Sequence, residues 1–332
     1  MSAIRTGLVA CLLLAACGGN PLDSGGGGGG TGGGTGGGTT VGITPKEVAR
    51  DMNAFSYNGN VLKIDMQGVS SSGKLATFTR AAGMDVPSTN GNAGYRAYIY
   101  QDTALTRSYL AYVATNERGN LVAVTGSDGG QFNEHNAGGQ FVQLTAFTRP
   151  TTADAPESGL FSYAGSYVGT FTPGEYADGS DPRPPELRPA EPWIVKGTIQ
   201  VNGDFAHSAV EGGITERQLF DQAGNQVTSM VINDGDPTTT DEVIDTTTLQ
   251  ALVLRETAIA DNGTFLGNVE YFGAPDSIQG NYAGAFGGRG ATDVAGVLWV
   301  HPIDGNSGIW EHGVFNLPRC DMAGSSPLCV PR

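Results

Sequence analysis

The sequence predicts an all-β protein, with an antiparallel β-barrel of eight, or up to ten, strands in the C-terminal half, preceded by a smaller β-rich, handle-like domain. Two observations predict this class. Hydrophobic residues fill 39% of the 332 positions and charged residues only 15%, which suits a β-rich extracytoplasmic protein better than a helical cytoplasmic one. Apolar and polar residues also alternate along most of the chain, in runs separated by turns rich in Gly, Asn and Asp.

Residues 1–16 form a predicted secretory signal peptide. Arg5 carries its one positive charge, an apolar run follows, and small residues lead into Cys17. Residues 14–17 resemble the lipobox of bacterial lipoproteins, in which the cysteine is acylated and becomes the mature N-terminus. So short an apolar run does not anchor a protein by spanning a bilayer. We therefore expect lipid on Cys17 to hold the protein, and the glycines after it favour sorting to the outer membrane; an ordinary signal peptide with a chance cysteine is the alternative.

Residues 17–43 comprise the lipidated cysteine and a predicted flexible tether, because residues 18–40 are dominated by Gly and Thr and cannot bury apolar surface. The net charge of −15 becomes −16 when Arg5 is removed with the signal. Such a surface repels nucleic acid and anionic lipid headgroups. We therefore expect no nucleic-acid partner.

The cysteines fit an oxidising compartment. Cys11 leaves with the signal peptide and Cys17 carries lipid, so that only Cys320 and Cys329 remain. We expect these two to form a disulfide that closes the tail, residues 320–332. A zinc site is the weaker alternative, because no histidine lies nearby.

Residues 44–152 form the predicted handle-like region. It opens with Thr44, Pro45 and Glu47, the arrangement of a capping box, which predicts a short helix to about Asn53. Alternation then predicts strands at residues 95–100, 108–114, 120–125 and 140–147, with a hairpin connection at residues 115–120. An acidic stretch rich in Pro and Thr at residues 149–159 suggests the domain boundary.

Residues 153–319 form the predicted barrel. Phe161, Tyr163, Tyr167 and Phe171 share one strand face with two glycines, and residues 278–286 repeat the pattern with Ile, Gly, Tyr, Gly and Phe. Glycines beside aromatics suit a tightly curved sheet, so two such strands suggest closure. Further strands are predicted at residues 193–201, 218–221, 226–232, 249–254, 264–272, 294–300 and 309–317. Residues 246–260 could instead be a helix.

Residues 280–297 carry a recognisable motif: a Gly-rich strand that ends in an aromatic, then a Gly, a short turn with Ala and an acidic residue, and a strand that starts with Gly. It resembles the closing motif of the barrel domain in transferrin-binding protein B and its relatives. The matching positions are Gly280, Phe286, Gly287, Ala291, Asp293, Val294 and Gly296. Gly288 stands where the family usually has proline, and Asp293 where glutamate is commoner. The resemblance extends over about residues 158–300, with Tyr163 in the position of the opening strand.

In that family a tethered, lipid-anchored body with a handle and an eight-stranded barrel stands on the outer membrane and captures a protein or haem for metal acquisition. The resemblance therefore implies a cell-surface binding protein with a protein or haem-carrier ligand and an outer-membrane receptor partner, without enzymatic activity or resident cofactor. It does not identify the ligand. The lumen of a small barrel is filled by side chains, so we expect binding on loops at residues 172–192, with Tyr176, or 234–245.

Two other groups of residues could bind a metal ion, but their patterns are less specific. His301 and His312, on the last two strands, could face each other as two metal or haem-iron ligands, although isolated surface histidines are commoner. Asp234, Asp236 and the carboxylates near residue 241 could hold calcium or simply form a solvated loop. No nucleophile elbow, zinc-protease helix or nucleotide-binding loop occurs.

Two other functions stay open on the sequence alone. One is a periplasm-facing structural or adhesive envelope lipoprotein without a dedicated ligand. The other is a carbohydrate-active enzyme, which needs two carboxylates about 5–9.5 Å apart in one cleft. Asp241 and Glu242 are adjacent, so that on a strand they would point to opposite faces and could not serve together.

Overall fold

The computed structural model describes residues 40–41, 44–69, 73–87, 94–131, 134–151, 159–172, 191–232, 242–301 and 309–329. It is almost entirely β-structure, in two large sheets and one small ribbon. The predicted signal peptide, Cys17 and most of the tether lie outside the described residues. Within the described ranges, none of the helices has the length and apolar character needed to cross a bilayer.

The N-terminal sheet contains eight antiparallel strands in sequence order. They are β1 (Thr40–Val41), β2 (Met52–Tyr57), β3 (Leu62–Met66), β4 (Ala76–Arg80), β5 (Tyr95–Tyr100), β6 (Tyr109–Thr115), β7 (Leu121–Asp128) and β8 (Ala137–Gln143). The predicted strands β5 to β7 and the connection at residues 115–120 are confirmed. The last strand was expected at residues 140–147 and instead begins at Ala137, because Gly138 and Gly139 pair with β7 although they bring no apolar side chain.

The predicted capping box at Thr44 is wrong. The helix α1 spans only Lys46–Ala49, and the side chain of Thr44 makes no cap. Its hydroxyl oxygen instead accepts a 3.0 Å hydrogen bond from the backbone N–H of Phe141 in β8. The Thr44 hydroxyl, which the local sequence predicted as a helix cap, is therefore used in a contact with a distant strand. The strand β2 begins at Met52, where the helix was expected to continue.

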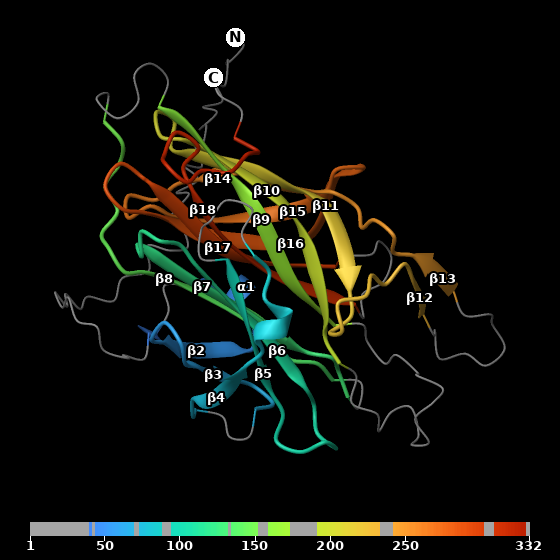
Figure 1. Cartoon of the computed structure of the whole chain (residues 1–332). Helices are drawn as coiled ribbons and strands as arrows, with labels where there is room; N and C mark the ends of the chain where they lie inside the picture. The colour runs from blue at the N-terminus through green and yellow to red at the C-terminus, as the bar shows by residue number, and fades with distance from the viewer. Residues whose placement is uncertain are drawn as a thin grey trace, which may run out of the picture.

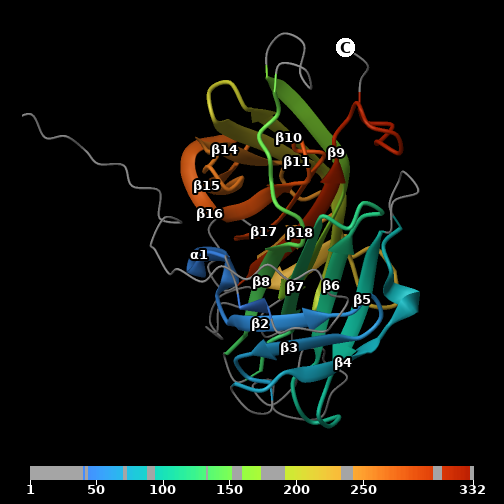
Figure 2. The same ribbon diagram turned by 90° about the vertical axis from the view of Figure 1, so that its left-hand side faces the viewer.

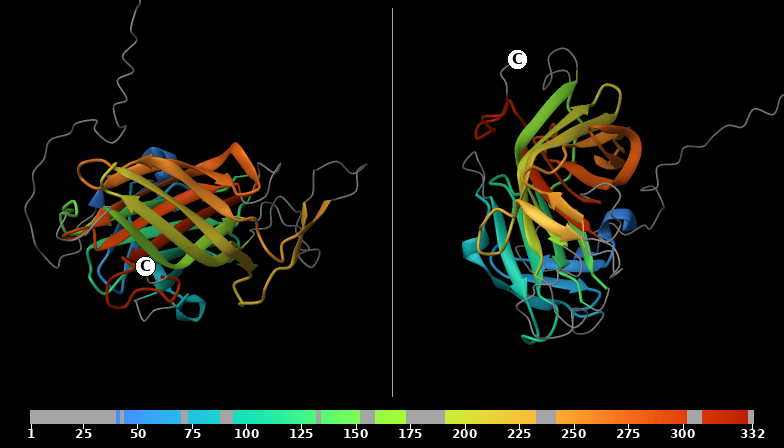
Figure 3. Two further views of the ribbon diagram at one scale, coloured as in Figure 1. Left: turned by 90° about the horizontal axis from the view of Figure 1, so that it is seen from above. Right: turned by 90° about the vertical axis from the view of Figure 1, so that its right-hand side faces the viewer.

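The predicted barrel of eight antiparallel strands is confirmed. Its strands are β9 (Leu160–Thr172), β10 (Trp193–Asp204), β11 (Ala209–Phe220), β14 (Leu252–Ala258), β15 (Thr264–Tyr271), β16 (Ala274–Gly287), β17 (Asp293–Val300) and β18 (Trp310–Pro318). They run obliquely around the barrel (Figure 3). The ring closes between β18 and β9, whereas the two strands rich in glycine and aromatics, β9 and β16, are not neighbours.

Two details of the predicted barrel were wrong. Only residues 218–221 of the twelve-residue strand β11 were expected, because its first half holds Gly212 and Gly213 and shows weak alternation. The strand expected at residues 226–232 is β12 (Ser229–Ile232), which pairs with β13 (Glu242–Asp245) in a ribbon beside the barrel (Figure 1). The strand expected at residues 249–254 is confirmed as β14, whose Leu252 and Leu254 both point into the barrel core, and the alternative helix at residues 246–260 does not form.

The lumen is filled by side chains, as expected. The aromatic residues of β9 and β16 enter one buried cluster with those of β15 and the turn after β10: Tyr163, Tyr167, Phe171, Phe205, Phe265, Tyr282 and Phe286. The ring of Phe286 contacts those of Tyr163, Phe205 and Phe265. Ile278 was expected on the same inward face of β16, but its side chain is 48% exposed, because the pairing of β15 with β16 shifts register near Glu270.

The outer wall of the barrel packs on one face of the N-terminal sheet (Figures 1 and 2). Small barrel residues such as Ala283, Ala285 and Ala295 share a buried cluster with Tyr112 and Phe141 of the sheet. The sheet has a second core on its other face, around Phe55 and Tyr98. The two predicted domains are thus joined by a buried cluster to which both contribute side chains. The predicted boundary at residues 152 and 153 lies outside the described residues.

The strand directions give the barrel two distinct ends. We call the end where β9 stops at Thr172, β17 stops at Val300 and β18 starts at Trp310 the loop end. The opposite end, where β16 stops at Gly287 and β17 starts at Asp293, is the motif end.

Candidate functional site

The motif at residues 280–297 forms β16, β17 and the turn between them. Its glycines allow close approach of backbones: a Cβ on Gly280 would lie 2.0 Å from the carbonyl oxygen of Trp299, and one on Gly296 would lie 2.4 Å from that of Ala283. Phe286 and Val294 are fully buried in the barrel core. These motif residues thus serve the fold.

The turn of the motif is also built for contact. A Cβ on Gly287 would lie 2.7 Å from the side chain of Leu121 in the N-terminal sheet. Ala291 adopts a positive φ of 53°, and its carbonyl oxygen accepts a 2.6 Å hydrogen bond from the hydroxyl of Tyr163. The turn is therefore fastened both to the opening strand of the barrel and to the sheet below it.

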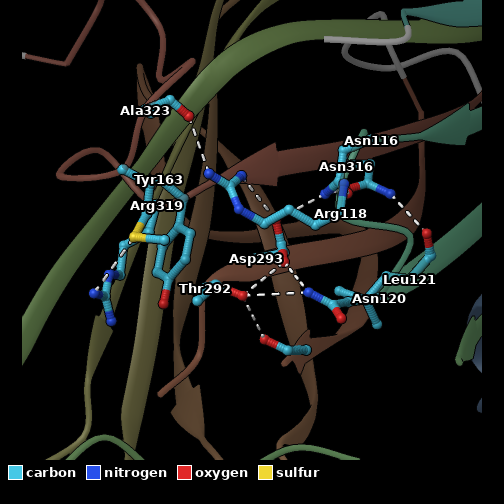
Figure 4. A network of polar contacts seen from close by, with 12 residues as sticks. Asn116, Arg118, Asn120, Leu121, Tyr163, Thr292, Asp293, Asn316, Arg319 and Ala323 are labelled. Atoms are coloured by element: carbon cyan, nitrogen blue, oxygen red, sulfur yellow. Dashed lines mark hydrogen bonds and ion pairs between the residues drawn. The ribbon is translucent and has the colours of Figure 1, made fainter. Parts of the chain in front are cut away.

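Asp293 is the centre of this contact (Figure 4). Its carboxylate is completely buried and accepts hydrogen bonds from Asn116 at 2.9 Å, Asn120 at 2.5 Å and Thr292 at 2.8 Å. Arg118 adds an ion pair at 3.3 Å. Because Asn116 to Asn120 form the β6–β7 connection, the acidic residue of the motif fixes that hairpin to the barrel, and the whole network is structural.

The expected disulfide between Cys320 and Cys329 is present. The tail that it closes returns to the motif end, where the N–H of Cys320 bonds to the carbonyl oxygen of Ser162 and the guanidinium of Arg118 bonds to that of Ala323. The tail therefore belongs to the same structural network.

A buried ion pair inside the barrel was not predicted. Arg217 and Glu311 are both fully buried and paired, and the hydroxyl of Tyr167 donates a 2.6 Å hydrogen bond to the same carboxylate. Burial raises the pKa of Tyr167 well above its usual range, so the phenol stays a donor. The sequence held a signal for this, because Glu311 alternates with Phe315 and Leu317 and so shares their inward face.

A group of cationic and aromatic side chains spans the two sheets at the loop end. We call it the tryptophan–histidine cluster, and it consists of Arg50, His135, Trp299, His301, Trp310 and His312. Arg50 lies directly after α1 and His135 in the connection between β7 and β8, and the other four lie on or directly after β17 and β18. Of these residues, the sequence pointed only to His301 and His312.

The guanidinium of Arg50 lies over both indoles of the cluster, 4.5 Å from the ring centre of Trp299 and 4.4 Å from that of Trp310. The two indole centres are 5.2 Å apart. His301 and His135 pack on Trp310 with ring centres 4.4 and 5.0 Å away. A cation over the faces of two indoles is held electrostatically by both rings.

The cluster favours the uncharged forms of His135 and His312. Burial, and secondarily the charge of Arg50, lowers the pKa of His135 and places that of His312 well below its usual range. Burial also lowers the pKa of Arg50 itself. His312 is 1% exposed, and neither of its ring nitrogens has a hydrogen-bond partner.

The structure brings His301 and His312 into this one cluster, but Trp299, not His301, lies opposite His312 in the strand register. The Nδ1 atom of His301 lies 3.2 Å from the carbonyl oxygen of Ile309. Among the described residues, no three metal-ligating side chains converge. A two-histidine metal or haem-iron site stays a prediction.

The predicted binding loops and the possible calcium loop lie largely outside the described residues. Of the loop at 172–192, residues 173–190, including Tyr176, are not described, and Asp234, Asp236 and Asp241 are not described either. The strands on either side of the first loop meet the loop end, where β9 stops at Thr172 and β10 starts at Trp193. Residues 242–245, expected as the end of the second loop, are instead the strand β13. Binding on these loops stays a prediction.

No protein-family model matches this chain, and no curated protein matches it in sequence. Solved structures of transferrin-binding protein B (TbpB) are similar to it. Intact Ap-TbpB with its N and C lobes is 13% identical with a TM-score of 0.37, covering 80% of this chain and 43% of that one. A double mutant of the vaccine antigen TbpB from Haemophilus parasuis Hp5 is 12% identical with a TM-score of 0.33, covering 80% and 53%. Isotype 1 TbpB from serogroup B Neisseria meningitidis is 12% identical with a TM-score of 0.31, covering 82% and 42%.

This chain thus spans about half the length of the structures that it matches. Its own fold is that of an all-β protein with a filled eight-stranded barrel packed on an eight-stranded sheet.

Proposed function

We propose that this chain is a lipid-anchored outer-membrane protein, exposed at the cell surface, that captures a protein or a haem or iron carrier. The observation that carries the proposal is a lipobox and glycine tether joined to a closed barrel with a filled lumen. A protein on a flexible tether can meet a partner away from its own membrane. A filled lumen leaves the loops and the outer surface for binding.

The loop end is the surface that we propose for capture. The chain leaves β9 at Thr172 and β17 at Val300 on this end, and the half-buried Trp299 and Trp310 lie beside these exits. Tryptophan and arginine are the residues that most often dominate binding energy at protein interfaces. The motif end is occupied by the Asp293 network and the disulfide-closed tail.

The function that we propose is non-enzymatic and uses no resident cofactor. A receptor in the outer membrane would take over the captured cargo, as the resemblance to the TbpB family implies. The net charge of −15 argues against nucleic acid as the cargo.

Lipidation is tested by mass spectrometry of the protein from membranes, which we expect to show acyl groups on Cys17 as the N-terminus. Replacement of Cys17 by Ser should release the protein from the membrane fraction. An unmodified Cys17 would overturn the anchor. Protease added to intact cells should degrade the wild-type protein; protection on intact cells combined with digestion after lysis would instead support the periplasm-facing envelope lipoprotein.

Capture is tested by passing growth medium, serum and a haem solution over the immobilised protein. We expect specific retention by the wild-type protein and a loss of at least tenfold for Trp310→Ala at the loop end. His207→Ala is the matched control, because His207 is an exposed residue in the turn at the motif end. Retention of nothing would refute capture, and hydrolysis of glycan substrates would support the enzyme alternative.

A further inference from the structure

We propose that Arg50 and the two indoles under it form a binding site for an oxyanion, a carboxylate or phosphate group carried by a ligand. This inference adds the ligand chemistry of the loop end, where capture is proposed. Its test uses free anions and purified protein, so that its failure is distinguishable from a failure of capture or of lipid anchoring.

Arg50 is half-buried, and it differs from six other arginines of the described chain because its guanidinium has no acceptor there. Six arginines form ion pairs with carboxylates: Arg80, Arg107, Arg118, Arg217, Arg255 and Arg319. Among the described residues, no carboxylate or carbonyl group accepts a hydrogen bond from the side chain of Arg50. Its neighbour Asp51 is engaged elsewhere, by the backbone N–H of Ala137 at 3.0 Å.

The indoles hold this guanidinium by its face. The guanidinium carbon lies 4.5 Å from the ring centre of Trp299 and 4.4 Å from that of Trp310, so that the indoles contact the flat face of the group. This stacking leaves the N–H groups at the edge of the guanidinium unused. That edge is the fork that matches the two oxygens of a carboxylate or a phosphate. The arginine is therefore ordered in advance and lacks only its anion.

The side chains around Arg50 hold unused donors. The Nε1 N–H groups of Trp299 and Trp310 are buried without a hydrogen-bond partner, and the uncharged ring of His312 has one further N–H and one acceptor nitrogen, both unpaired. Asp51 is the carboxylate whose charge acts on Arg50 and His135, but among the described residues it forms no ion pair with either of them. Asp128 and Glu134 both pair with Arg107. A second, independent observation thus points to the same missing partner, an acceptor with negative charge.

The backbone at Arg50 is strained in a way that positions this side chain. Arg50 is a non-glycine residue with φ 47° and ψ −109°, directly after α1. The conformation is held by hydrogen bonds from its N–H to Lys46 and from the N–H of Asp51 to Ala137 in β8. Strain of this kind persists where the surrounding structure enforces it, and it gathers at binding sites.

The experiment exploits the positions of the tryptophans. The chain has three tryptophans, Trp193, Trp299 and Trp310, and two of them lie in the proposed site. Fluorescence of the purified protein is titrated with sodium citrate and with sodium phosphate at pH 7, against sodium chloride of equal ionic strength. We expect a saturable change with at least one of the two oxyanions and none with chloride. The oxyanion that binds with the higher affinity, citrate or phosphate, tells whether the ligand group is a carboxylate or a phosphate.

Variants assign the change to Arg50. Arg50→Gln should weaken the oxyanion at least tenfold, and Arg50→Lys should bind with intermediate strength, because it keeps the charge but loses the fork. Trp193→Phe should keep the full response, and circular dichroism verifies the fold of each variant. The absence of a saturable change with both oxyanions in the wild-type protein, or an unchanged affinity in Arg50→Gln, overturns the proposal. If Arg50→Gln does not fold, the comparison of Arg50→Lys with the wild-type protein decides.

Discussion

Asn120 donates a 2.5 Å hydrogen bond to the buried carboxylate of Asp293, although 173 residues separate the two in the sequence. Asn120 ends the β6–β7 connection, and Asp293 begins β17 of the barrel. This bond joins the two sheets at the motif end, while the tryptophan–histidine cluster joins them at the loop end. The two sheets are thus fixed to each other at both ends of their shared core.

Replacement of Asp293 by Asn should destabilise the protein by about 2–4 kcal/mol, because it removes the charge that pairs with the half-buried Arg118 and leaves one of the amide donors of Asn116 and Asn120 without its acceptor. Urea denaturation measures the change. Asp276→Asn is the matched control, since the carboxylate of Asp276 is 85% exposed and should contribute less than about 1 kcal/mol. Equal stability of the two variants would contradict the structural role of Asp293.

Replacement of Gly280 by Ala should cost about 1–3 kcal/mol, because the new Cβ would lie 2.0 Å from the backbone carbonyl oxygen of Trp299, which cannot move without distorting the β16–β17 pairing. Gly273→Ala places a methyl group where no atom lies within 4 Å and should change stability by less than about 0.5 kcal/mol. Thermal denaturation of both variants makes the comparison, and a neutral Gly280→Ala would show that the motif glycine is dispensable.

Replacement of Glu311 by Gln should cost about 3–5 kcal/mol, because the guanidinium of Arg217 then stays charged and unpaired inside the barrel. Adding Arg217→Met should recover most of this loss, because it removes the unpaired charge while the amide oxygen of Gln can still accept the hydroxyl of Tyr167. Denaturation of the single and double variants measures the coupling, and purely additive losses would argue against a paired charge in the lumen.

The stability of the protein should fall as the pH drops below about 6.5, the usual pKa of histidine. The pKa values of His312 and His135 are lowered in the folded protein by burial and by the charge of Arg50. In the unfolded chain both titrate normally, so that below this pH the unfolded state binds more protons and becomes favoured. His301 and Arg50 add repulsion, and Asp51 opposes it.

The melting temperature between pH 7.5 and 5 measures this dependence, and His312→Phe should flatten it. The variant should be nearly as stable as the wild type at pH 7.5, because it replaces a buried ring without hydrogen bonds by an apolar one. His207→Gln is the control, because a hydrogen bond to Asp204 raises the pKa of the exposed His207, and so the contribution of His207 to stability is lost as the pH rises and not as it falls. An unchanged slope in His312→Phe would show that other groups cause the loss.

Much of the barrel could be predicted because its strands carry their pattern locally. The aromatic and glycine alternation of β9 reports which face is inside, and the structure buries Tyr163, Tyr167 and Phe171 there. The strand β11 was largely missed, since Gly212 and Gly213 sit against neighbouring strands and contribute no apolar signal. Likewise Thr44 bonds to Phe141, 97 residues away, which no local capping rule could anticipate.

The sequence by itself determined the class of fold, the closing motif and the pairing of the last two cysteines, because alternation, turn chemistry and cysteine count act over a few neighbouring residues. Only the tertiary structure decided that Asp293 fastens the N-terminal hairpin, that Glu311 meets Arg217, and that Arg50 lies over Trp299 and Trp310. These relationships join segments about 90 to 260 residues apart. Burial, charge pairing and ring stacking depend on distance in space, which the closed barrel and its packing on the sheet create.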